Sequence, residues 1–454
     1  MLAWYGLVVL IIATVLAAVD RQVMVLLAEP IRQSLGLSDT KLGLLHGVGI
    51  TLFSGAAAVP LGWLADRYGR RIVLASCVLV WTAATAACGL AWDFPSLFAA
   101  AIGLGIGEAG LAPIVYGLIP EMVPAKRRVL ANGIYAVAAI FGAGIGIWLS
   151  GSLIDTLQSA RDLLPLAMRS METWRLAFFA VALPGPVVAV LIMLIRLRKA
   201  PAGPGKAGAA APMRLADYLR KHGTTVLGVF GGTGLGGLGI AALGAWAPVI
   251  ASRNFGGTPQ EVGQGIGAAY LIGTLAGALI GGFGVRWLRP LLGVATPIRV
   301  LVIGFALSAV AAAGLLGATS AMHVYVLFGL QVAFLIAGSV VAPTLLQDMT
   351  PSTLRSRVIA LGSVVTLLLT ALSPVLVGVV SDALQAEPRG LQVSVAVVAA
   401  AGLVLGSFLT FKVERRFVAT VLAICEDAAQ SDSPTSAPPA SAAPNPSHNG
   451  NKNV

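Results

Sequence analysis

The sequence predicts an all-α membrane protein with about twelve transmembrane helices. Of its 454 residues, 57% are hydrophobic and only 11% are charged, whereas roughly 25% of the residues in a soluble domain are charged. The apolar residues gather in runs of about 20, the length that a helix needs to cross the hydrocarbon core. The 54 glycines lie among Ala, Val and Leu, a composition typical of helices that pack closely in lipid. A water-soluble fold is therefore excluded.

Twelve such runs follow one another, separated by charged residues, glycine or proline. The first has no Lys or Arg before Arg21 and stays apolar through Leu27, so we expect a membrane helix rather than a cleaved signal sequence. Whether the natural chain begins earlier stays open. The predicted spans are 3–28, 40–61, 72–91, 94–118, 129–154, 174–196, 224–250, 260–285, 297–317, 322–346, 358–380 and 391–411.

The basic residues indicate how the chain crosses the membrane. Lys and Arg number 30 against 19 Asp and Glu, which gives a formal charge of +11. If the amino terminus is cytoplasmic, the gaps and tail on that side hold 22 basic residues and the opposite gaps hold seven, with Arg21 in the first span. Because basic residues are enriched in cytoplasmic loops, we expect both termini in the cytoplasm. Short basic gaps without interleaved aromatic residues do not form a nucleic-acid surface.

The spans divide into two halves of six. Residues 1–196 and 224–426 form the predicted halves, joined by a cytoplasmic linker over 197–223 that is rich in Ala, Gly, Pro and Lys. Glu121-Met122-Val123-Pro124 precedes the fifth span and Asp348-Met349-Thr350-Pro351 precedes the eleventh, so these spans are predicted repeat equivalents. Such repeats are typical of transporters whose halves rock around a site near the mid-plane. The tail, 427–454, is rich in Ser, Pro and Ala, and we expect it to be disordered and cytoplasmic.

A charged loop between the second and third spans indicates a superfamily. Its sequence, Gly62-Trp63-Leu64-Ala65-Asp66-Arg67-Tyr68-Gly69-Arg70-Arg71, closely resembles the signature loop of the major facilitator superfamily. The resemblance implies the major facilitator fold and places Asp66 against the cytoplasmic start of the eleventh helix, near Arg357, where the contact holds the inner gate closed. A helix amino terminus attracts a carboxylate, while Gly62 permits close helix approach and Gly69 a tight turn. The alternative, a basic loop that only sets the membrane topology, accounts for the arginines. It does not account for Gly62, Asp66 and Gly69.

Three stretches of the first half resemble the spinster-type branch of this superfamily. They are Asp20-Arg21, Leu35-Gly36-Leu37-Ser38-Asp39-Thr40 and Gly103-Leu104-Gly105-Ile106-Gly107-Glu108-Ala109-Gly110. Animal members of the branch move lysophospholipids and sphingosine phosphate, and the resemblance implies a bacterial homologue in the inner membrane. The alternating glycines of the third stretch lie in an apolar helix without a preceding strand, which argues against a nucleotide-binding loop.

The fourth span departs from the family pattern at Ala101. The superfamily commonly places an arginine there, two helical turns before Glu108 on nearly the same face. Two hypotheses follow: the protein relies on Arg21 alone, or the alanine is a substitution that disables coupling. We favour the second, because without that base two intramembrane acids face one arginine.

Three ionisable residues lie deep within the predicted spans, namely Asp20 and Arg21 in the first and Glu108 in the fourth. A charge at this depth costs at least about 2.5–3.5 kcal/mol and should face a wet cavity or a partner. Burial favours a protonated carboxyl and a nearby arginine favours an ionised one. We therefore expect Asp20 and Glu108 to exchange protons, with Glu108 as the main carrier, and Arg21 to be available to an anionic head group. A purely structural ion pair is the alternative. His46 could join the relay or be a hydrogen-bonded packing residue.

These observations together predict a monomeric secondary active transporter, coupled to protons as a symporter or antiporter. It moves an amphipathic lipid-like or organic solute, such as a lysolipid, by alternating access. Its expected partners are this solute, protons and membrane lipids, with no nucleic acid, cofactor or metal. Two alternatives stay open, a multidrug exporter of the same fold and a membrane enzyme acting on lipid. The four histidines, at 46, 222, 323 and 448, are too scattered to suggest a catalytic cluster.

Overall fold

The computed structural model describes residues 2–196, 215–351 and 354–432, and these residues form helices joined by short connections, without a β-strand. The all-α prediction is confirmed. In this part of the chain, eleven helical segments are long and apolar enough to cross a membrane. One of them, Pro259–Gly317, comprises two helices, α13 and α14, so all twelve predicted spans are present.

The N-terminal half contains the first six spans, and several of them are broken into two helices. Gly110 separates α6 from α7 and Pro184 precedes α11, because glycine and proline weaken or interrupt a helix. A π-helix, η1, lies within the second span. The elements are α1 (Leu2–Leu26), α2 (Ala28–Leu35), α3 (Asp39–Leu44), η1 (Leu45–Leu52), α4 (Phe53–Tyr68), α5 (Arg70–Leu90), α6 (Phe94–Ala109), α7 (Leu111–Met122), α8 (Ala125–Ser159), η2 (Arg161–Leu163), α9 (Leu166–Arg169), α10 (Thr173–Ala182) and α11 (Gly185–Met193).

The C-terminal half contains the other six spans and a terminal helix. Thr258 begins α13 with a capping box, in which its side chain and that of Glu261 each accept a backbone N–H of the other residue. The elements are α12 (Leu215–Phe255), α13 (Pro259–Leu292), η3 (Gly293–Ala295), α14 (Thr296–Gly314), η4 (Leu315–Gly317), α15 (Ala321–Ser339), α16 (Ala342–Asp348), α17 (Arg355–Ala383), α18 (Gly390–Lys412) and α19 (Glu414–Asp432).

Two predicted boundaries differ from the structure. α12 begins at Leu215 rather than at 224, because Tyr218 is buried and donates a hydrogen bond to the carbonyl oxygen of Met349, which anchors more than two extra turns. Residues 197–214 of the predicted linker lie outside the described residues. α19 takes in residues 427–432 of the predicted tail, since Phe417 and Val421, one turn apart, are buried and hold this helix on the bundle. The remaining tail lies outside the described residues.

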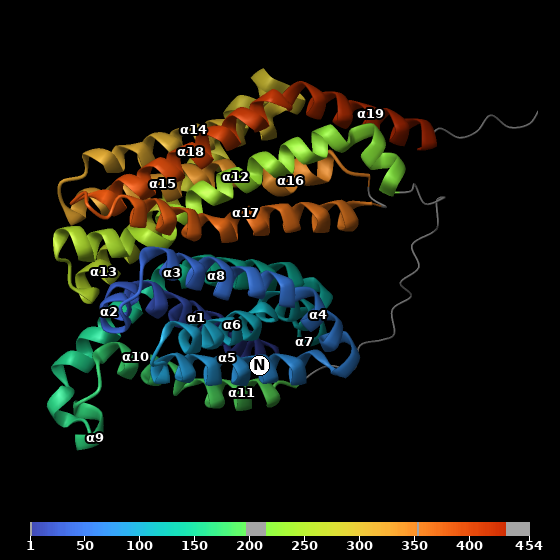
Figure 1. Ribbon diagram of the computed structural model, residues 1–454. Coiled ribbons are helices and arrows are strands. Elements are labelled where there is room, and N and C mark those ends of the chain that lie inside the picture. Colours follow the sequence, from blue (N-terminus) through green and yellow to red (C-terminus); the bar gives the residue numbers. More distant parts are fainter. Residues whose placement is uncertain (1, 197–214, 352–353, 433–454) are drawn as a thin grey trace, which may run out of the picture.

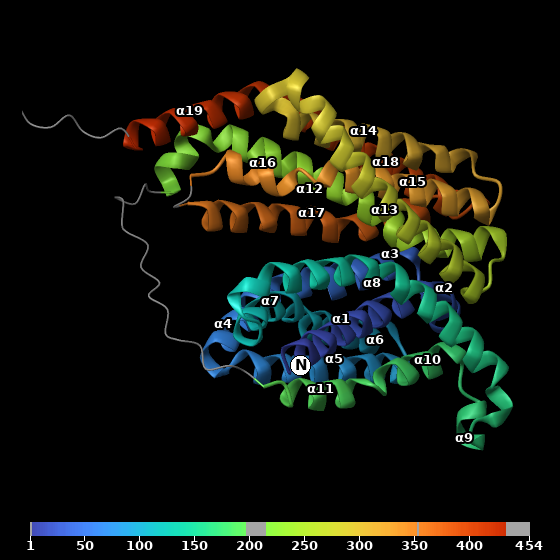
Figure 2. The same ribbon diagram turned by 180° about the vertical axis from the view of Figure 1, so that it is seen from behind.

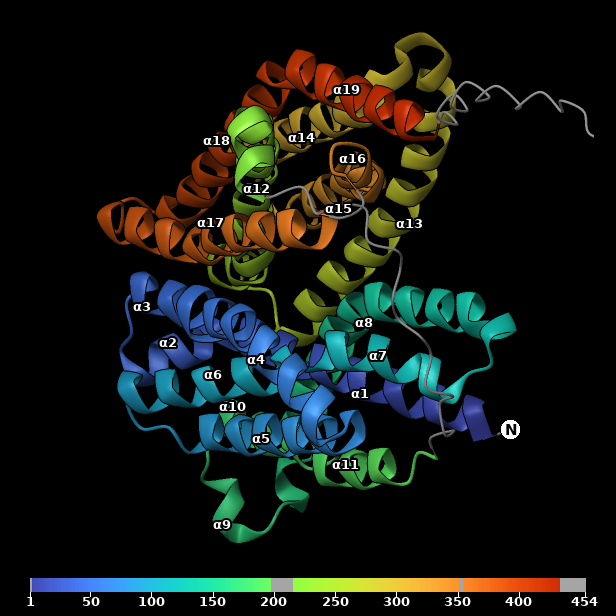
Figure 3. The same ribbon diagram turned by 90° about the vertical axis from the view of Figure 1, so that its right-hand side faces the viewer.

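The two halves are helical bundles that lie one above the other in Figures 1 and 2. We name the two ends of the molecule by residues: the Gly69 end, where α4 joins α5, and the Glu29 end, where α2 follows α1. Across the interface α17 packs along α3 and η1, while α13 packs along α8; Figure 3 shows these two pairs side by side. The predicted repeat equivalents, α8 and α17, thus each contact the opposite half.

The halves touch near the Glu29 end and separate towards the Gly69 end. A Cβ built on Gly43 would lie 2.3 Å from the carbonyl oxygen of Pro374, so the backbones of α3 and α17 are in direct contact. Gly55 still contacts α17. One and two turns further on the same face, Val59 is 80% exposed and no atom lies within 4 Å of a Cβ built on Gly62.

The other interface, between α8 and α13, opens in the same direction. Gly144 and Gly151 of α8 contact α13, and a Cβ built on Gly151 would lie 2.7 Å from the carbonyl oxygen of Pro259. Ile140 and Val137 precede Gly144 by one and two turns on the same face, yet both are exposed. The described structure is therefore open towards the Gly69 end.

Gly107 allows α6 to touch α5, and its replacement should destabilise the N-terminal half. A Cβ there would lie 2.5 Å from the backbone nitrogen of Trp81. Gly107→Ala should lower the unfolding temperature in detergent, because overpacking costs about 1–3 kcal/mol. Gly133 of α8 has open space around it, so Gly133→Ala should raise that temperature slightly, as alanine favours a helix by about 1 kcal/mol. Shifts of the same sign and size in both variants would contradict the packing argument.

Candidate functional site

Arg21 of α1 and Glu108 of α6 form an ion pair within the membrane-spanning part of the N-terminal half. The guanidinium contacts Oε2 of Glu108 through Nη2 at 2.5 Å and through Nε at 3.1 Å. The side chain of Glu108 is 3% exposed, whereas that of Arg21 is 52% exposed. Oε1 of Glu108 is buried and has no hydrogen-bond partner among the described residues. The guanidinium of Arg21 is therefore accessible, whereas the carboxylate of Glu108 that pairs with it is buried.

Asp20 faces α5 rather than Arg21. It is 1% exposed, and its Oδ1 accepts a hydrogen bond from the Thr85 hydroxyl at 3.0 Å, while Oδ2 is buried without a partner in the described part of the chain. The structure thus brings Arg21 to Glu108 and leaves Asp20 with a neutral partner. Asp20, Arg21 and Glu108 together bring two carboxyls and one guanidinium, and only Glu108 pairs with the guanidinium, so the three residues carry a net negative charge unless one carboxyl is protonated. Because an unpaired buried carboxylate is costly, this arrangement is chemically suited to bind a proton.

Small residues on α6 bring Glu108 close to its neighbours. A Cβ built on Gly105 would lie 2.5 Å from the carbonyl oxygen of Ile50 in η1, so α6 touches η1 on one side and α5 on the other. The alternating glycines therefore serve helix packing. Ala101 is wholly buried, and its Cβ lies 3.4 Å from a Cβ built on Gly49. The surrounding atoms leave Ala101 no exposed surface, so an arginine at position 101 would require neighbouring groups to move in this conformation.

His46 lies in η1, and π-helical turns often occur at functional sites. Its Nδ1 is 3.0 Å from the carbonyl oxygen of Leu42, and its Nε2 is buried without a partner among the described residues. No hydrogen bond of the described residues joins His46 to Arg21 or Glu108. The geometry agrees with a hydrogen-bonded packing residue, and membership of a proton relay stays a prediction.

The loop over residues 62–71 contacts its own half. Gly69 has a φ of +96°, which favours glycine, and turns the chain from α4 into α5. Asp66 pairs with Arg70 at 2.7 Å, and Arg70 also pairs with Glu121 of α7. Glu121 is thus a partner of this loop that the sequence pattern did not assign to it.

The other predicted gating residues are also held away from the opposite half. Arg71 donates a hydrogen bond to the carbonyl oxygen of Ile195 at 2.9 Å, and Arg67 lies over two aromatic rings of α4. Arg357 of α17 is exposed. No ion pair between described residues joins Asp66 to α17, because the halves are apart at the Gly69 end. The predicted gate contact is therefore not made in this conformation.

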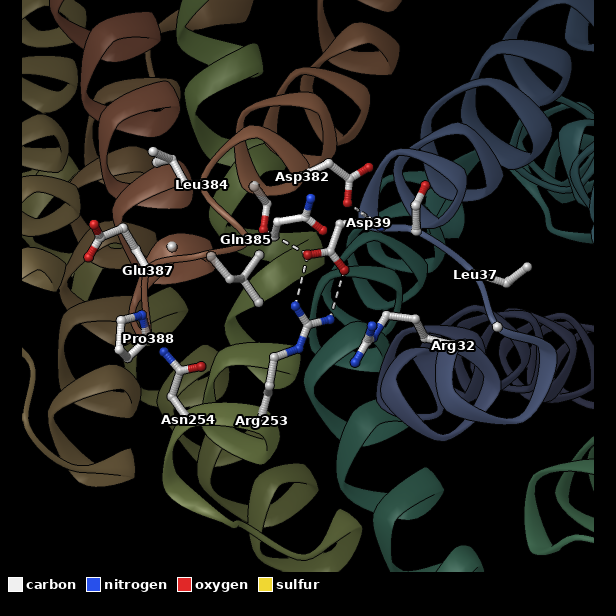
Figure 4. A pocket seen from close by; sticks show the side chains of 15 residues that line it. Arg32, Leu37, Asp39, Arg253, Asn254, Asp382, Leu384, Gln385, Glu387 and Pro388 are labelled. Carbon is white, nitrogen blue, oxygen red and sulfur yellow. Dashed lines mark hydrogen bonds and ion pairs between the residues drawn. The ribbon is translucent and has the colours of Figure 1, made fainter.

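A second charged cluster joins the two halves at the Glu29 end (Figure 4). Arg253, in the last turn of α12, binds Asp39 at the start of α3 through both terminal nitrogens, each at 2.8 Å. Its Nε donates to Glu29 of α2 at 2.8 Å. From α17, Asp382 accepts hydrogen bonds from the backbone N–H groups of Asp39 and Thr40, both at 2.9 Å. The Glu29-end cluster comprises Glu29, Asp39, Arg253, Ser381 and Asp382.

The cluster is largely shielded from water. The side chains of Asp39 and Arg253 are 8% and 22% exposed, and the Ser381 hydroxyl donates to Asp39 at 2.7 Å. Burial raises the pKa of the Glu29 carboxyl, but its hydrogen bonds and ion pairs with Arg32 and Arg253 outweigh this effect and hold its pKa below the ordinary value. A cavity of about 510 Å³ adjoins the cluster.

Sequence reasoning does not find this cluster. In the sequence Arg253 is one of seven basic residues in the outer gaps, and its partner Glu29 lies 224 residues away. The available signal is weak: Glu29 and Asp39 are acids that flank the short connection between the first two spans. The spacing of these two acids does not indicate that Arg253 is the base that they contact.

Two relatives of similar sequence are named as transporters or efflux pumps. An MFS-type efflux pump of Mycolicibacterium smegmatis is 27% identical over 282 residues, which is 62% of each chain, so the match covers less than two thirds of either protein. The sphingosine-1-phosphate transporter SPNS2 of Xenopus tropicalis is 25% identical over 398 residues, covering 83% of this chain and 73% of the relative.

A solved structure shares the fold along nearly the whole chain. It is a bacterial homologue of the human lysosomal transporter Spinster in an inward-facing, unoccupied conformation, with a TM-score of 0.72, 22% identity, and coverage of 94% of this chain and 98% of that chain. The predicted resemblance to spinster-type proteins is confirmed. The sequence model of the Major Facilitator Superfamily matches residues 10–296, which is more than half of the chain. The chain accordingly belongs to the Major Facilitator Superfamily, whose members are integral membrane transport proteins.

Proposed function

We propose that this protein is a proton-coupled secondary transporter that moves an amphipathic, lipid-like anion by alternating access. The observation that carries the proposal is the ion pair in which Arg21 is half-exposed and Glu108 is buried. An anionic head group that binds Arg21 replaces Glu108 as its counter-charge. Glu108 then takes up a proton, because an unpaired carboxylate is costly to bury.

This competition couples the proton to the substrate. A protonated Glu108 releases Arg21 for the head group, and a bound head group favours the protonated form of Glu108. Binding of each therefore favours binding of the other, which is the linkage expected of a symporter. Asp20, with one buried unpaired oxygen, is the second proton site of the proposal.

The distribution of charge favours an amphipathic substrate. The N-terminal half carries the three intramembrane charges, whereas the stretches 222–252, 262–285 and 358–381 of the C-terminal half contain no Asp, Glu, Lys or Arg. A charged head group would bind at Arg21, and an apolar chain would lie against the opposite half. The same division disfavours a sugar-like solute, which is polar over its whole surface.

We also propose that the Gly69 end faces the cytoplasm of a bacterial inner membrane. Of the 30 basic residues, 22 lie in the gaps and tail assigned to that side. In this proposal the conformation open towards the Gly69 end is inward-facing. The two halves rock about their interface in a single monomer surrounded by lipid, with the connection between α11 and α12 and the end of the chain after α19 on the cytoplasmic side.

A drug exporter is the second candidate, because the Mycolicibacterium smegmatis relative is named an efflux pump. Proteoliposomes can separate the two functions. Uptake of labelled sphingosine 1-phosphate, a lysophospholipid and common drugs is measured with and without a pH gradient. Gradient-driven uptake of the lipid-like anions supports the main proposal, and gradient-driven movement of the drugs alone supports an exporter. A rate that no gradient alters for any compound would rule out proton coupling.

Glu108→Gln should separate proton coupling from substrate movement. The glutamine imitates the protonated carboxyl, so accumulation driven by a pH gradient should fall to the level of empty liposomes, while exchange of labelled for unlabelled substrate continues. Glu172→Gln is the matched control, because Glu172 lies outside the spans and pairs with Arg175. Full gradient-driven accumulation by Glu108→Gln would remove Glu108 from the proton pathway.

Arg21→Met should weaken binding of an anionic head group selectively. A hydrogen bond to a charged group is worth about 1.5–3 kcal/mol, so the Kd for sphingosine 1-phosphate should rise roughly tenfold to a hundredfold. Sphingosine lacks the phosphate, and its Kd should change little. Binding to protein in nanodiscs measures both constants, and Arg21→Lys should give an intermediate value for the phosphate. An equal loss for both ligands would indicate a structural role instead.

Asp66→Asn should favour the conformation open towards the Gly69 end, because a carboxylate at a helix amino terminus stabilises the closed gate by about 0.3–2 kcal/mol. Spin labels at Lys126 of α8 and Gly284 of α13 report the distance between the halves at that end. The variant should increase the population at long distance. Asp93→Asn, which alters a cap within the N-terminal half, serves as the control; identical distributions for Asp66→Asn and the parent protein would argue against the gate contact.

A further inference from the structure

We infer that the Glu29-end cluster is a latch that holds the halves together at that end, and that it must open before the protein can reach the conformation open at the Glu29 end. The inference rests on the alternating access of the proposed function, but on neither the substrate nor the proton. It assigns a role to charged residues that the site around Arg21 does not use.

The first part of the latch is one base held between two acids of the opposite half. Arg253 of the C-terminal half makes the two ion pairs that connect the halves among the described residues, one with Glu29 and one with Asp39. The side chains of these acids are only 6% and 8% exposed. In the described part of the chain, loss of Arg253 would leave the shielded carboxylate of Asp39 without an ion pair and Glu29 with Arg32 as its remaining ion-pair partner. Separation of the halves, which hydrates both acids, would then be favoured.

The second part is a helix cap supplied by the other half. The first backbone N–H groups of a helix have no partner within the helix. At the start of α3, the N–H groups of Asp39 and Thr40 donate to the two carboxylate oxygens of Asp382 in α17. A carboxylate at this position also interacts favourably with the helix dipole. When the halves separate at the Glu29 end, both N–H groups lose this acceptor.

The two ends of one helix pair therefore carry equivalent contacts. Residues 39–68 form a single membrane-spanning segment that packs against α17. At its Glu29 end, Asp382 of α17 caps the segment; at its Gly69 end, Asp66 of the segment is predicted to approach the start of α17. The halves are together at the Glu29 end and apart at the Gly69 end, so only the first contact is made. A rocking motion would exchange one contact for the other.

Direct backbone contact makes this helix pair suitable as a pivot. Cβ atoms built on Gly43 and Gly47 would lie 2.3 Å and 2.1 Å from carbonyl oxygens of Pro374 and Ala371. Gly43 of α3 and Gly47 of η1 have no side chain to interlock with α17, so a change of angle at these two places need not break interdigitated packing. The adjoining cavity, lined in part by Asn254, Gln385 and Glu387, gives water a route to the separating charges.

Distance measurements at both ends test the latch. Spin labels at Leu90, which is exposed, and at Gly317, which has open space around it, report the Glu29 end. Labels at Lys126 and Gly284 report the Gly69 end. The native cysteines are replaced by alanine, and the protein is studied in nanodiscs without substrate or a pH gradient. The readout therefore does not depend on the proposed transport activity.

Arg253→Met should increase the ratio of long to short distances at the Glu29 end at least tenfold, because removal of one member of a buried ion pair is strongly destabilising. Asp382→Asn keeps one acceptor oxygen and the side-chain shape, so it should fold normally and produce a smaller shift of the same sign. Arg253→Lys should lie between the parent and Arg253→Met. In each case the Gly69 end should close as the Glu29 end opens.

Arg299→Met is the matched control, because Arg299 pairs with Glu414 inside the C-terminal half. It should leave both distances unchanged. Unchanged distances in Asp382→Asn and Arg253→Met would overturn the latch, and so would opening at the Glu29 end without closure at the Gly69 end. If the latch variants shift both ends while no solute is taken up by proteoliposomes, the proposed substrate fails and the latch stands.

Discussion

Backbone contact at glycine is the constraint on which the rest of this structure depends. In a bilayer, apolar side chains gain little by leaving lipid for another helix, so helices associate through close packing and polar contacts. Gly107 brings α6 against the backbone of α5, and Gly105 brings it against η1. Glu108 follows directly and is carried to within reach of Arg21. The same kind of contact at Gly43 joins the halves across α3 and α17. Side chains at these glycine positions would push the helices apart. The charged groups that the helices carry would then move apart as well.

Charge compensation then distinguishes the two ends of the molecule. At the Glu29 end, Arg253 pairs with two acids of the opposite half. At the Gly69 end, Arg70 pairs with Asp66 and Glu121 of its own half. The two ends thus differ in the distance between the halves and also in whether an arginine pairs with acids of the opposite half or of its own half. Between the ends, Arg21 and Glu108 form a pair that belongs to one half only, so this pair does not depend on contact between the halves.

Much of the fold follows from local properties of the sequence. A run of about 20 apolar residues suffices to predict a span, and all twelve runs became helices in the described residues. The cost of burying a charge in lipid singled out Asp20, Arg21 and Glu108 without knowledge of their surroundings. The turn at Gly69 needed a residue that tolerates a positive φ, and glycine stands there. These predictions succeed because each depends on a local property: the length and hydrophobicity of one run of residues, or the backbone conformation available to one residue.

The tertiary structure alone decided which charges meet. Arg21 pairs with Glu108 and not with its neighbour Asp20, because the rotation of α1 and α6 sets the direction of each side chain. Arg253 reaches Glu29, 224 residues away, through the stacking of two half-molecules. Ala101 proves to be packed against η1, where a family pattern places a base. The sequence encodes the helices and, through its glycines, surfaces on which they can meet. Which of these surfaces are joined depends on how the two half-molecules stack on each other, and no local pattern in the sequence records that stacking.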